Sequence, residues 1–384
     1  MRAKWLLAFG SVVLTLIALE FLLARLVPQR TMNHVLSNRA GVYRVSDTVL
    51  TELIPNATGR EREHEGEFDV AVQVNSLGYR QAEFDPVKAD QLRIVALGDS
   101  FTFGDGVEER DAWPRALERA LAAGASRRVE VINAGVPGRW VDEYYLELKR
   151  RSLPLQPDVV VVGFFLGNDI VGPDAETHVW TEVDARGRPL RIDRPNERIE
   201  SGFRVMRVPK PRWRIPLVRN SHVAQLVYDG GKAIVQRWRP STPDEDALFV
   251  AEYTPETAAV VQRVENLFVA MAEACREHGV RLLVAMIPTR EQVRPELAAG
   301  TAARGFEQPN RRFAAFFAAA GIAFVDLLPV LRDAASGGPL YYRFDGHWTP
   351  RGHAVAAQAI AARLADLDRG APAAPRALDA PHAR

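Results

Sequence analysis

The chain has 384 residues, of which 47% are hydrophobic and 25% charged, and its formal net charge at pH 7 is +1. These proportions are those of an ordinary globular protein, and the balanced charge gives no electrostatic reason to expect nucleic acid as a partner. A single cysteine, Cys275, excludes an intrachain disulfide. Because Cys275 lies on an apolar stripe at helical spacing, we expect a small buried hydrophobic residue rather than a reactive thiol.

The N-terminal segment is apolar over nearly the length of a membrane span. Two basic residues precede an almost unbroken apolar run from Trp5 to Ala24, which Glu20 interrupts. This run exceeds the usual signal-peptide core of about 7–15 residues and approaches the roughly 20 residues of a transmembrane helix. We therefore expect residues 1–30 to form an uncleaved membrane anchor rather than a removed signal, with the rest of the chain periplasmic or extracellular.

Short apolar strands alternate with helical stretches in the next part of the chain and again toward its end. Strands are predicted over residues 93–97, 129–133, 158–164, 281–287 and 323–326. Helices are predicted from Asp111 as N-cap to a stop at Gly124, from Thr254-Pro255 to Gly279, over 310–320, and from Thr349-Pro350 to Leu367. This alternation favours an α/β domain, residues 91–369, with a parallel sheet covered by helices on both faces.

Three segments lie outside that alternation. Residues 31–90 are predicted to be a polar lead-in, with a solvated loop at the charge run Arg60–Glu65 in which His64 is not a ligand candidate. Residues 170–250 are rich in Pro, Arg and Trp and are predicted to be a lid-like insertion over one edge of the sheet. The Ala/Pro-rich tail, residues 370–384, is predicted to be disordered.

A basic cluster with one tryptophan lies in the insertion. A solvated lid surface is the simplest interpretation, and an anionic polysaccharide or lipid headgroups are the alternatives. Its members are Arg204, Arg207, Lys210, Arg212, Trp213, Arg214 and Arg219.

Four short blocks carry the residues needed for nucleophilic catalysis. Gly98-Asp99-Ser100 ends the first strand, Asn133–Gly138 and Gly167-Asn168-Asp169 follow the next two, and Asp345-Gly346-His347 precedes the last helix. Ligands of open α/β sheets bind at the carboxyl ends of the strands, where these blocks are expected to meet. A hydroxyl, an imidazole beside a carboxylate, and amide donors are the parts of an acyl-transfer site.

The four blocks resemble, in order, those of the SGNH (GDSL-like) hydrolase superfamily. The resemblance implies a flavodoxin-like three-layer α/β/α sandwich with a central parallel sheet. It implies Ser100 as nucleophile, His347 as base and Asp345 as the acid that orients it. It further implies an oxyanion hole formed by the backbone N–H groups of Ser100 and Gly138 and by the amide of Asn168. Asp99 is expected to shape the nucleophile turn.

The last block departs from the usual spacing of this superfamily. The acid and histidine are normally separated by two residues, whereas one residue separates Asp345 from His347. The Asp-x-His-Trp form is similar to that of bacterial polysaccharide O-acetyltransferases of the superfamily. A serine esterase acting on O-acyl groups of a cell-envelope glycan or lipid is the first hypothesis, because it is what the superfamily resemblance implies. An O-acetyltransferase for an exported polysaccharide and a non-catalytic glycan-binding protein are the alternatives.

No cofactor or metal is expected. Asp345 and His353 could be considered as a metal site, but no third ligand lies at a recognisable spacing. We therefore interpret His353 as a capping or packing residue of the last helix. Gly98, Gly104 and Gly106 do not have the spacing of a dinucleotide-binding or phosphate-binding loop. No pattern indicates an oligomeric state.

Overall fold

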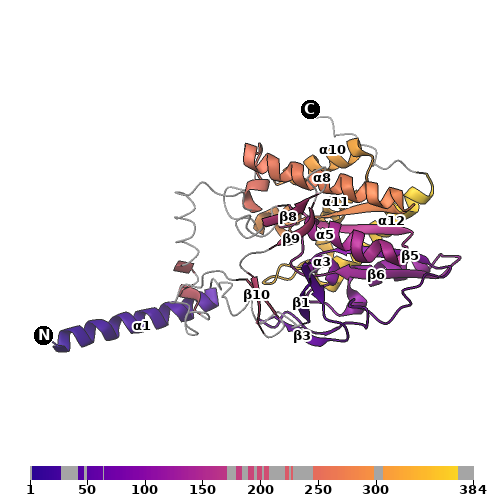
Figure 1. Ribbon diagram of the computed structural model, residues 1–384. Helices are drawn as coiled ribbons and strands as arrows, with labels where there is room; N and C mark the ends of the chain where they lie inside the picture. The colour runs from indigo at the N-terminus through magenta and orange to yellow at the C-terminus, as the bar shows by residue number, and fades with distance from the viewer. Residues whose placement is uncertain are drawn as a thin grey trace.

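A parallel β-sheet with helices on both faces forms the body of the protein, and helix α1 extends away from it (Figure 1). This architecture comes from a computed structural model. The residues that it describes are 2–26, 42–46, 50–63, 65–170, 179–183, 189–193, 197–200, 203–206, 221–224, 226–227, 245–297 and 306–370.

The sheet has five strands in the order β13-β12-β7-β5-β6, and all neighbours are parallel. The strands are β5 (Leu92–Gly98), β6 (Val129–Gly135), β7 (Val159–Phe165), β12 (Arg281–Ile287) and β13 (Ala323–Asp326). In chain order this arrangement is the flavodoxin-like one, which confirms the predicted fold and its strands. The order reverses between β5 and β7, and a ligand crevice is expected at that point of a doubly wound sheet.

Alternate side chains of each strand enter two separate cores, which produces the three layers. On β5, Val95 and Leu97 pack toward one layer of helices, while Ile94 and Ala96 pack toward the other. The first layer contains α5 (Val141–Glu147), α8 (Pro255–Glu277) and α10 (Gln308–Ala320). The second contains α4 (Trp113–Ala122), α11 (Leu327–Ala334) and α12 (Pro350–Asp368).

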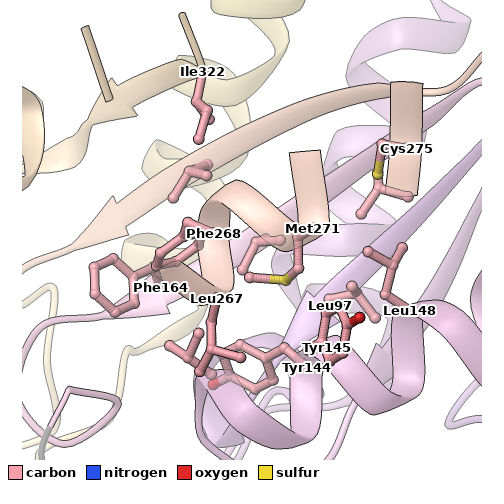
Figure 2. Packing of buried hydrophobic residues seen from close by; sticks show 14 of the residues in the cluster. Leu97, Tyr144, Tyr145, Leu148, Phe164, Leu267, Phe268, Met271, Cys275 and Ile322 are labelled. Atoms are coloured by element: carbon pink, nitrogen blue, oxygen red, sulfur yellow. The ribbon is translucent and has the colours of Figure 1, made fainter. Parts of the chain in front are cut away.

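Cys275 belongs to the first of these cores. It is 1% exposed and lies with Met271 and Phe268 on the face of α8 that meets the sheet and α5 (Figure 2). Burial raises the pKa of its thiol to about 12, so the thiolate is not formed at neutral pH. The prediction of a buried hydrophobic role is confirmed.

Two of the predicted helix starts are confirmed, and one is wrong. Thr254 and Thr349 are N-caps whose hydroxyls accept backbone N–H groups of the first turn, and each precedes a proline. Asp111 does not cap α4; it lies in a preceding 3₁₀ turn, and the helix ends at Ala122, before Gly124. Instead His353 of α12 is fully buried, and its Nδ1 accepts the backbone N–H of Trp113 at 3.2 Å. The cap of α4 is thus supplied from another helix.

The predicted polar lead-in contains two antiparallel hairpins. They are formed by β1 (Tyr43–Ser46) with β2 (Leu50–Leu53) and by β3 (Thr58–Arg62) with β4 (Asp69–Gln73). The solvated loop predicted for the charge run is wrong, because Glu61 is 2% exposed and Glu63 is 1% exposed. Side chains alternate along β3, so the inward positions carry these carboxylates while the arginines point outward. His64 lies outside the described residues.

Part of the insertion forms two further hairpins. Their strands are β8 (Val179–Val183), β9 (Pro189–Asp193), β10 (Glu197–Glu200) and β11 (Phe203–Met206). β9 lies near α5, and β11 lies near β1. The side chains of the basic cluster lie outside the described residues, and so does the tail from residue 371. The surface role of the cluster and the disorder of the tail therefore stay predictions.

Helix α1 (Arg2–Leu26) contains a stretch, Leu7–Leu26, that is long and apolar enough to cross a membrane. A signal sequence near an N-terminus satisfies the same criteria, so the choice of anchor over signal stays a prediction. The Glu20 carboxylate accepts hydrogen bonds from the Ser221 hydroxyl and from the backbone N–H groups of His222 and Val223, at 2.6–3.0 Å. The charge that interrupts the apolar run therefore has partners.

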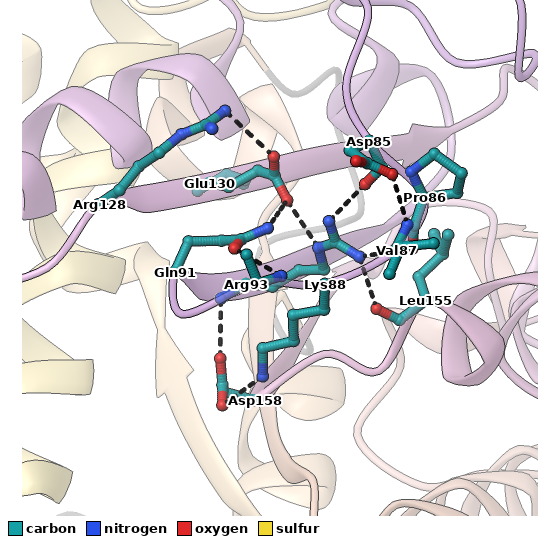
Figure 3. Close-up of polar contacts among 12 residues, drawn as sticks. Asp85, Pro86, Val87, Lys88, Gln91, Arg93, Arg128, Glu130, Leu155 and Asp158 are labelled. Atoms are coloured by element: carbon teal, nitrogen blue, oxygen red, sulfur yellow. Dashed lines mark hydrogen bonds and ion pairs between the residues drawn. The ribbon is translucent and has the colours of Figure 1, made fainter.

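A buried polar network closes the amino-terminal edge of the sheet (Figure 3). The fully buried Arg93 guanidinium pairs with Glu130 at 2.6 Å and donates to the carbonyl groups of Asp85, Pro86 and Leu155. Asp158 accepts the backbone N–H of Arg93 at 2.8 Å. These contacts fix the start of β5, whose other end carries Ser100.

Three glycines at the opposite edge let the turn after β5 lie directly on the sheet. This turn is the short helix α3 (Ser100–Phe103). A Cβ at Gly98 would lie 2.0 Å from Thr102 Oγ1, and one at Gly163 would lie 2.5 Å from the same atom. A Cβ at Gly135 would lie 2.2 Å from the backbone nitrogen of Phe103. The glycines of β5, β6 and β7 thus set the height of Ser100 above the sheet.

Gly135→Ala is expected to destabilise the protein, by about 1–3 kcal/mol or more, because the new methyl group overlaps backbone that cannot move without displacing α3. Gly124→Ala is the matched control: a Cβ there meets no atom within 4 Å, and the change is expected to be neutral or slightly stabilising. Thermal unfolding of the detergent-solubilised full chain measures both. Equal melting temperatures for the two variants would contradict this packing argument.

Candidate active site

Ser100 begins α3 at the carboxyl end of β5. The preceding Asp99 is the N-cap, and its Oδ1 accepts the backbone N–H of Phe101 at 2.9 Å. Gly104 ends the turn with a left-handed φ of 91°. Asp99 is fully buried, and burial raises its pKa to about 6 against the opposing hydrogen bond from Phe101 and the charge of His347. As expected from the sequence, Asp99 holds the turn while Ser100, 7% exposed, faces the site.

His347 and Asp345 reach Ser100 from the loop before α12. His347 Nε2 lies 2.7 Å from Ser100 Oγ, and His347 Nδ1 hydrogen-bonds to Asp345 Oδ1. The backbone N–H of His347 donates to the same carboxylate oxygen at 3.2 Å, and Gly346 between them has a φ of 87°. A glycine in this conformation explains how one intervening residue is enough. The three side chains that were predicted to form a triad lie in one hydrogen-bonded chain.

The imidazole of His347 is surrounded by carboxylates. Burial by itself lowers the pKa of His347, but the charge and hydrogen bond of Asp345, with the charges of Asp105 and Asp99, outweigh burial and raise it to about 9. Asp105 is partly buried, and burial together with the charge of Glu61 raises the pKa of its carboxyl well above the ordinary value. The site therefore favours the protonated imidazolium, the form that a general base takes after accepting a proton.

Aromatic contacts restrict the ring of His347. Phe101, the residue after the serine, lies with its ring centroid 5.0 Å from that of His347 and 5.0 Å from that of Trp348. Trp348 is fully buried and packs in turn on His353. His353 itself has its pKa lowered to about 3 by burial and by the charges of His347 and Arg80, so it stays neutral and packs between helices.

The residues expected to form the oxyanion hole lie at the same edge of the sheet. Asn168 lies in the turn after β7, which Asp169 holds by accepting the backbone N–H of Phe165 at 2.7 Å and the hydroxyl of Tyr144 at 2.9 Å. Within the described part of the chain, the side-chain oxygen of Asn168 is buried and has no hydrogen-bond partner. Gly138 follows β6 with a φ of 76°. No hydrogen bond among the described residues joins either of them to Ser100, and their role stays a prediction.

Two residues of the N-terminal lead-in contact the site and were not anticipated. The Glu67 carboxylate accepts the backbone N–H groups of Arg343, Phe344 and Asp345. The buried Arg80 guanidinium donates to the carbonyl groups of the loop that follows α3. No motif spacing marks either residue; only the alternation of the surrounding strands hints that charges there face inward.

The described parts of the chain contain no group of three or more His, Cys, Asp or Glu side chains that could hold a metal ion. Asp345 and His353, which the sequence analysis considered as metal ligands, have separate roles in the structure. The first binds His347, and the second binds the amino end of α4.

Comparison with known families gives a match in the C-terminal part of the chain. Residues 245–380, which include Asp345 and His347, match the family model described as the SGNH hydrolase-like domain of the acetyltransferase AlgX. Similar curated proteins are described as probable alginate O-acetylases AlgJ. The one from Azotobacter vinelandii is 34% identical over 122 residues, or 31% of this chain and 30% of the relative. The one from Pseudomonas syringae is 34% identical over 146 residues, or 37% and 36%. The chain thus spans about a third of the length of these relatives.

Solved structures with similar topology are more distant. The α/β hydrolase LAE5 from the metagenome of Lake Arreo is 13% identical, with a TM-score of 0.41 over 73% of this chain and 98% of that one. The acetylxylan esterase Axe2 from Geobacillus stearothermophilus is 12% identical, with a TM-score of 0.39 over 73% and 96%. The fold assignment rests instead on the strand order of the sheet and on the family model. The match over residues 245–380 and the strand order of the sheet support the resemblance of this chain to the SGNH hydrolase superfamily.

Proposed function

We propose that this protein transfers an acetyl group to hydroxyl groups of an exported polysaccharide through a covalent acyl-serine intermediate. The observation that carries the proposal is the 2.7 Å contact between Ser100 Oγ and His347 Nε2, with Asp345 on the other ring nitrogen. This is the arrangement by which a serine hydroxyl becomes a nucleophile.

In the first half-reaction Ser100 Oγ attacks the carbonyl carbon of an acetyl donor, and its proton passes to His347 Nε2. Asp345 stabilises the imidazolium that forms. The tetrahedral intermediate then collapses, the bond to the leaving oxygen breaks, and that oxygen takes the proton from His347. The N–H groups of Ser100 and Gly138 and the Asn168 amide are proposed to bind the oxyanion, and one such donor is typically worth about 10²–10³ in rate.

In the second half-reaction a sugar hydroxyl loses its proton to His347 and attacks the acetyl-serine carbonyl. The new ester bond forms, the bond to Ser100 Oγ breaks, and the serine recovers the proton. Water in place of the sugar hydroxyl would give acetate, so the esterase hypothesis uses the same residues and differs only in the acceptor. The alternative of a non-catalytic glycan-binding protein does not explain why Ser100 and His347 are hydrogen-bonded to each other.

The choice of acetyl group and polysaccharide is supported by the relatives. The matching family model is named for an acetyltransferase, and the similar curated proteins are named for acetylation of alginate. The apolar helix α1 supports a role at the membrane. We propose that α1 anchors the enzyme and that the catalytic domain lies on the exported side of the membrane. Its partner there is a polysaccharide acceptor, and nucleic acid is not proposed as a partner.

Ser100→Ala is expected to abolish both release of the phenol from an aryl acetate and appearance of an acetylated oligosaccharide, by about 10³-fold or more, since no other hydroxyl replaces the nucleophile. The assay uses the detergent-solubilised full chain with mass detection of the oligosaccharide. Ser126→Ala, at an exposed position, is the control. Acetate as the sole product would favour the esterase, and equal activity of Ser100→Ala and wild type would refute the serine mechanism.

The activity is expected to rise with pH, with an acid limb in kcat/KM near pH 9 rather than near the ordinary histidine value of about 6.5, because the base must be neutral and its pKa is raised to about 9. Asp345→Asn removes the main group that raises this pKa, so the acid limb is expected to move to lower pH. The rate should fall by about 10⁴-fold, because asparagine holds the imidazole in the wrong tautomer and does not stabilise the imidazolium by charge. The pH profile is measured with aryl acetate after subtraction of spontaneous hydrolysis. An acid limb near 6.5 in the wild type would contradict the raised pKa.

A further inference from the structure

Two loops that are far apart in the sequence each carry one half of the proposed catalytic pair. Ser100 begins α3, from which a loop continues to Val107, and His347 lies on the loop that begins at Tyr342. The β3–β4 hairpin and the adjoining Arg80 contact both loops. These contacts come from a part of the chain that precedes the α/β domain.

Contacts to the His347 loop come from the turn of the hairpin. The Glu67 carboxylate accepts three consecutive backbone N–H groups, from Arg343 at 2.6 Å, Phe344 at 2.8 Å and Asp345 at 3.0 Å. Three backbone N–H groups that donate to one charged acceptor fix both the position and the tilt of a loop. The residue whose carboxylate orients His347 is therefore itself attached to Glu67 through its backbone.

A second charged residue, Arg290, also binds the backbone of this loop. The Arg290 guanidinium donates to the carbonyl group of Arg343 and, at 3.5 Å, to that of Tyr342. The loop thus has its N–H groups bound by a carboxylate and its carbonyl groups bound by a guanidinium. The backbone N–H of Tyr342 also donates to the carbonyl group of His347 at 2.8 Å, so the loop keeps this hydrogen bond when either charged partner is removed.

Contacts to the Ser100 loop come from the strands of the hairpin and from Arg80. The Arg80 guanidinium donates to the carbonyl groups of Phe103 at 3.1 Å, Gly104 at 2.7 Å and Val107 at 2.6 Å. Glu61 of β3 accepts the N–H of Gly106 at 3.4 Å. The fold of the N-terminal segment is thereby tied to the turn that presents the nucleophile.

The two loops also meet directly beside the hairpin. The ring of Phe68 packs on that of Tyr342, with centroids 5.1 Å apart, and the Tyr342 hydroxyl donates to the carbonyl of Gly106 at 2.9 Å. A Cβ on Gly106 would lie 2.9 Å from both rings. The three segments therefore share one close-packed contact.

We propose that Glu67 is a positioning residue for the proposed acyl transfer, and that the β3–β4 hairpin is a clamp that sets the distance between Ser100 and His347. The proposal rests on the proposed function for its kinetic consequences only. Glu67 touches neither donor nor acceptor; it acts through the backbone of Asp345. A catalytic group displaced by about 1 Å can cost about 10²-fold in rate, so loosening this loop is expected to reduce catalysis without removing any reacting group.

Glu67→Ala is expected to lower kcat for aryl acetate hydrolysis by about 10²-fold with little change in KM. It is also expected to move the acid limb of the pH profile downward, because a displaced Asp345 raises the pKa of His347 less. Glu67→Gln keeps one carbonyl oxygen as an acceptor and should lie between Glu67→Ala and wild type. Gln73→Ala is the matched control, since Gln73 is an exposed residue of the same hairpin at the end of β4 that lies away from the turn. It should retain both kcat and the pH profile.

A readout that needs no activity separates this proposal from the proposed function. In the full chain with labelled histidine, the NMR titration of His347, assigned with His347→Gln, should show a lower pKa in Glu67→Ala than in wild type and no change in Gln73→Ala. An unchanged His347 pKa in folded Glu67→Ala would overturn the clamp, as would a loss of kcat that merely follows a lower melting temperature. A wild type without esterase or transfer activity would refute the proposed function, while the titration would still decide the clamp.

Discussion

The hydrogen bond between Ser100 Oγ and His347 Nε2 joins residues that are 247 positions apart, and the rest of the site is arranged around it. A contact of 2.7 Å between side chains tolerates little movement of either backbone. The glycines of three adjacent strands determine how closely α3 lies on the sheet. The short Asp345-Gly346-His347 turn directs one carboxylate oxygen at both the ring and the backbone of the histidine.

Strand β5 connects this site to a rigid support at the other edge of the sheet. At its start, Arg93 and Glu130 form a buried ion pair whose remaining hydrogen-bonding groups are largely satisfied by carbonyl groups and Gln91. Buried ion pairs are tolerated when their geometry and hydrogen bonds are this complete, and breaking one partner is costly. The pair therefore determines where β5 begins, and the hydrophobic cores on both faces carry that position to Ser100.

Electrostatics near His347 follow from the burial of carboxyl groups. Burial raises the pKa of Asp99 to about 6 and raises that of Asp105 well above its ordinary value, so these groups hold protons more readily than exposed acids. Asp345 hydrogen-bonds directly to the imidazole and contributes most to raising its pKa. A site of this kind stabilises the imidazolium of the proposed intermediate, and it does so at the cost of requiring a higher pH to keep the resting base neutral.

Local patterns in the sequence predicted the sheet, two helix starts and the residues of the candidate site. The alternation of apolar strands and helices predicted the sheet, because a side-chain period of two and buried parallel strands are visible in residue order. Thr254-Pro255 and Thr349-Pro350 predicted helix starts, since a cap and its first turn are neighbours in the chain. The four blocks predicted which side chains meet, because parallel strands place their carboxyl ends at one edge.

Tertiary structure alone decided the remaining contacts. The cap of α4 is a histidine 240 residues away, and Glu67 binds a loop 276–278 residues away, so neither has a local spacing to reveal it. The charge run at Arg60–Glu65 looked solvated because its composition is polar, whereas strand pairing turned Glu61 and Glu63 inward. Residue order determines which groups face the same side of an element. Which distant element they then meet depends on how the whole chain packs, because a hydrogen bond can be satisfied by any partner that the fold brings within reach.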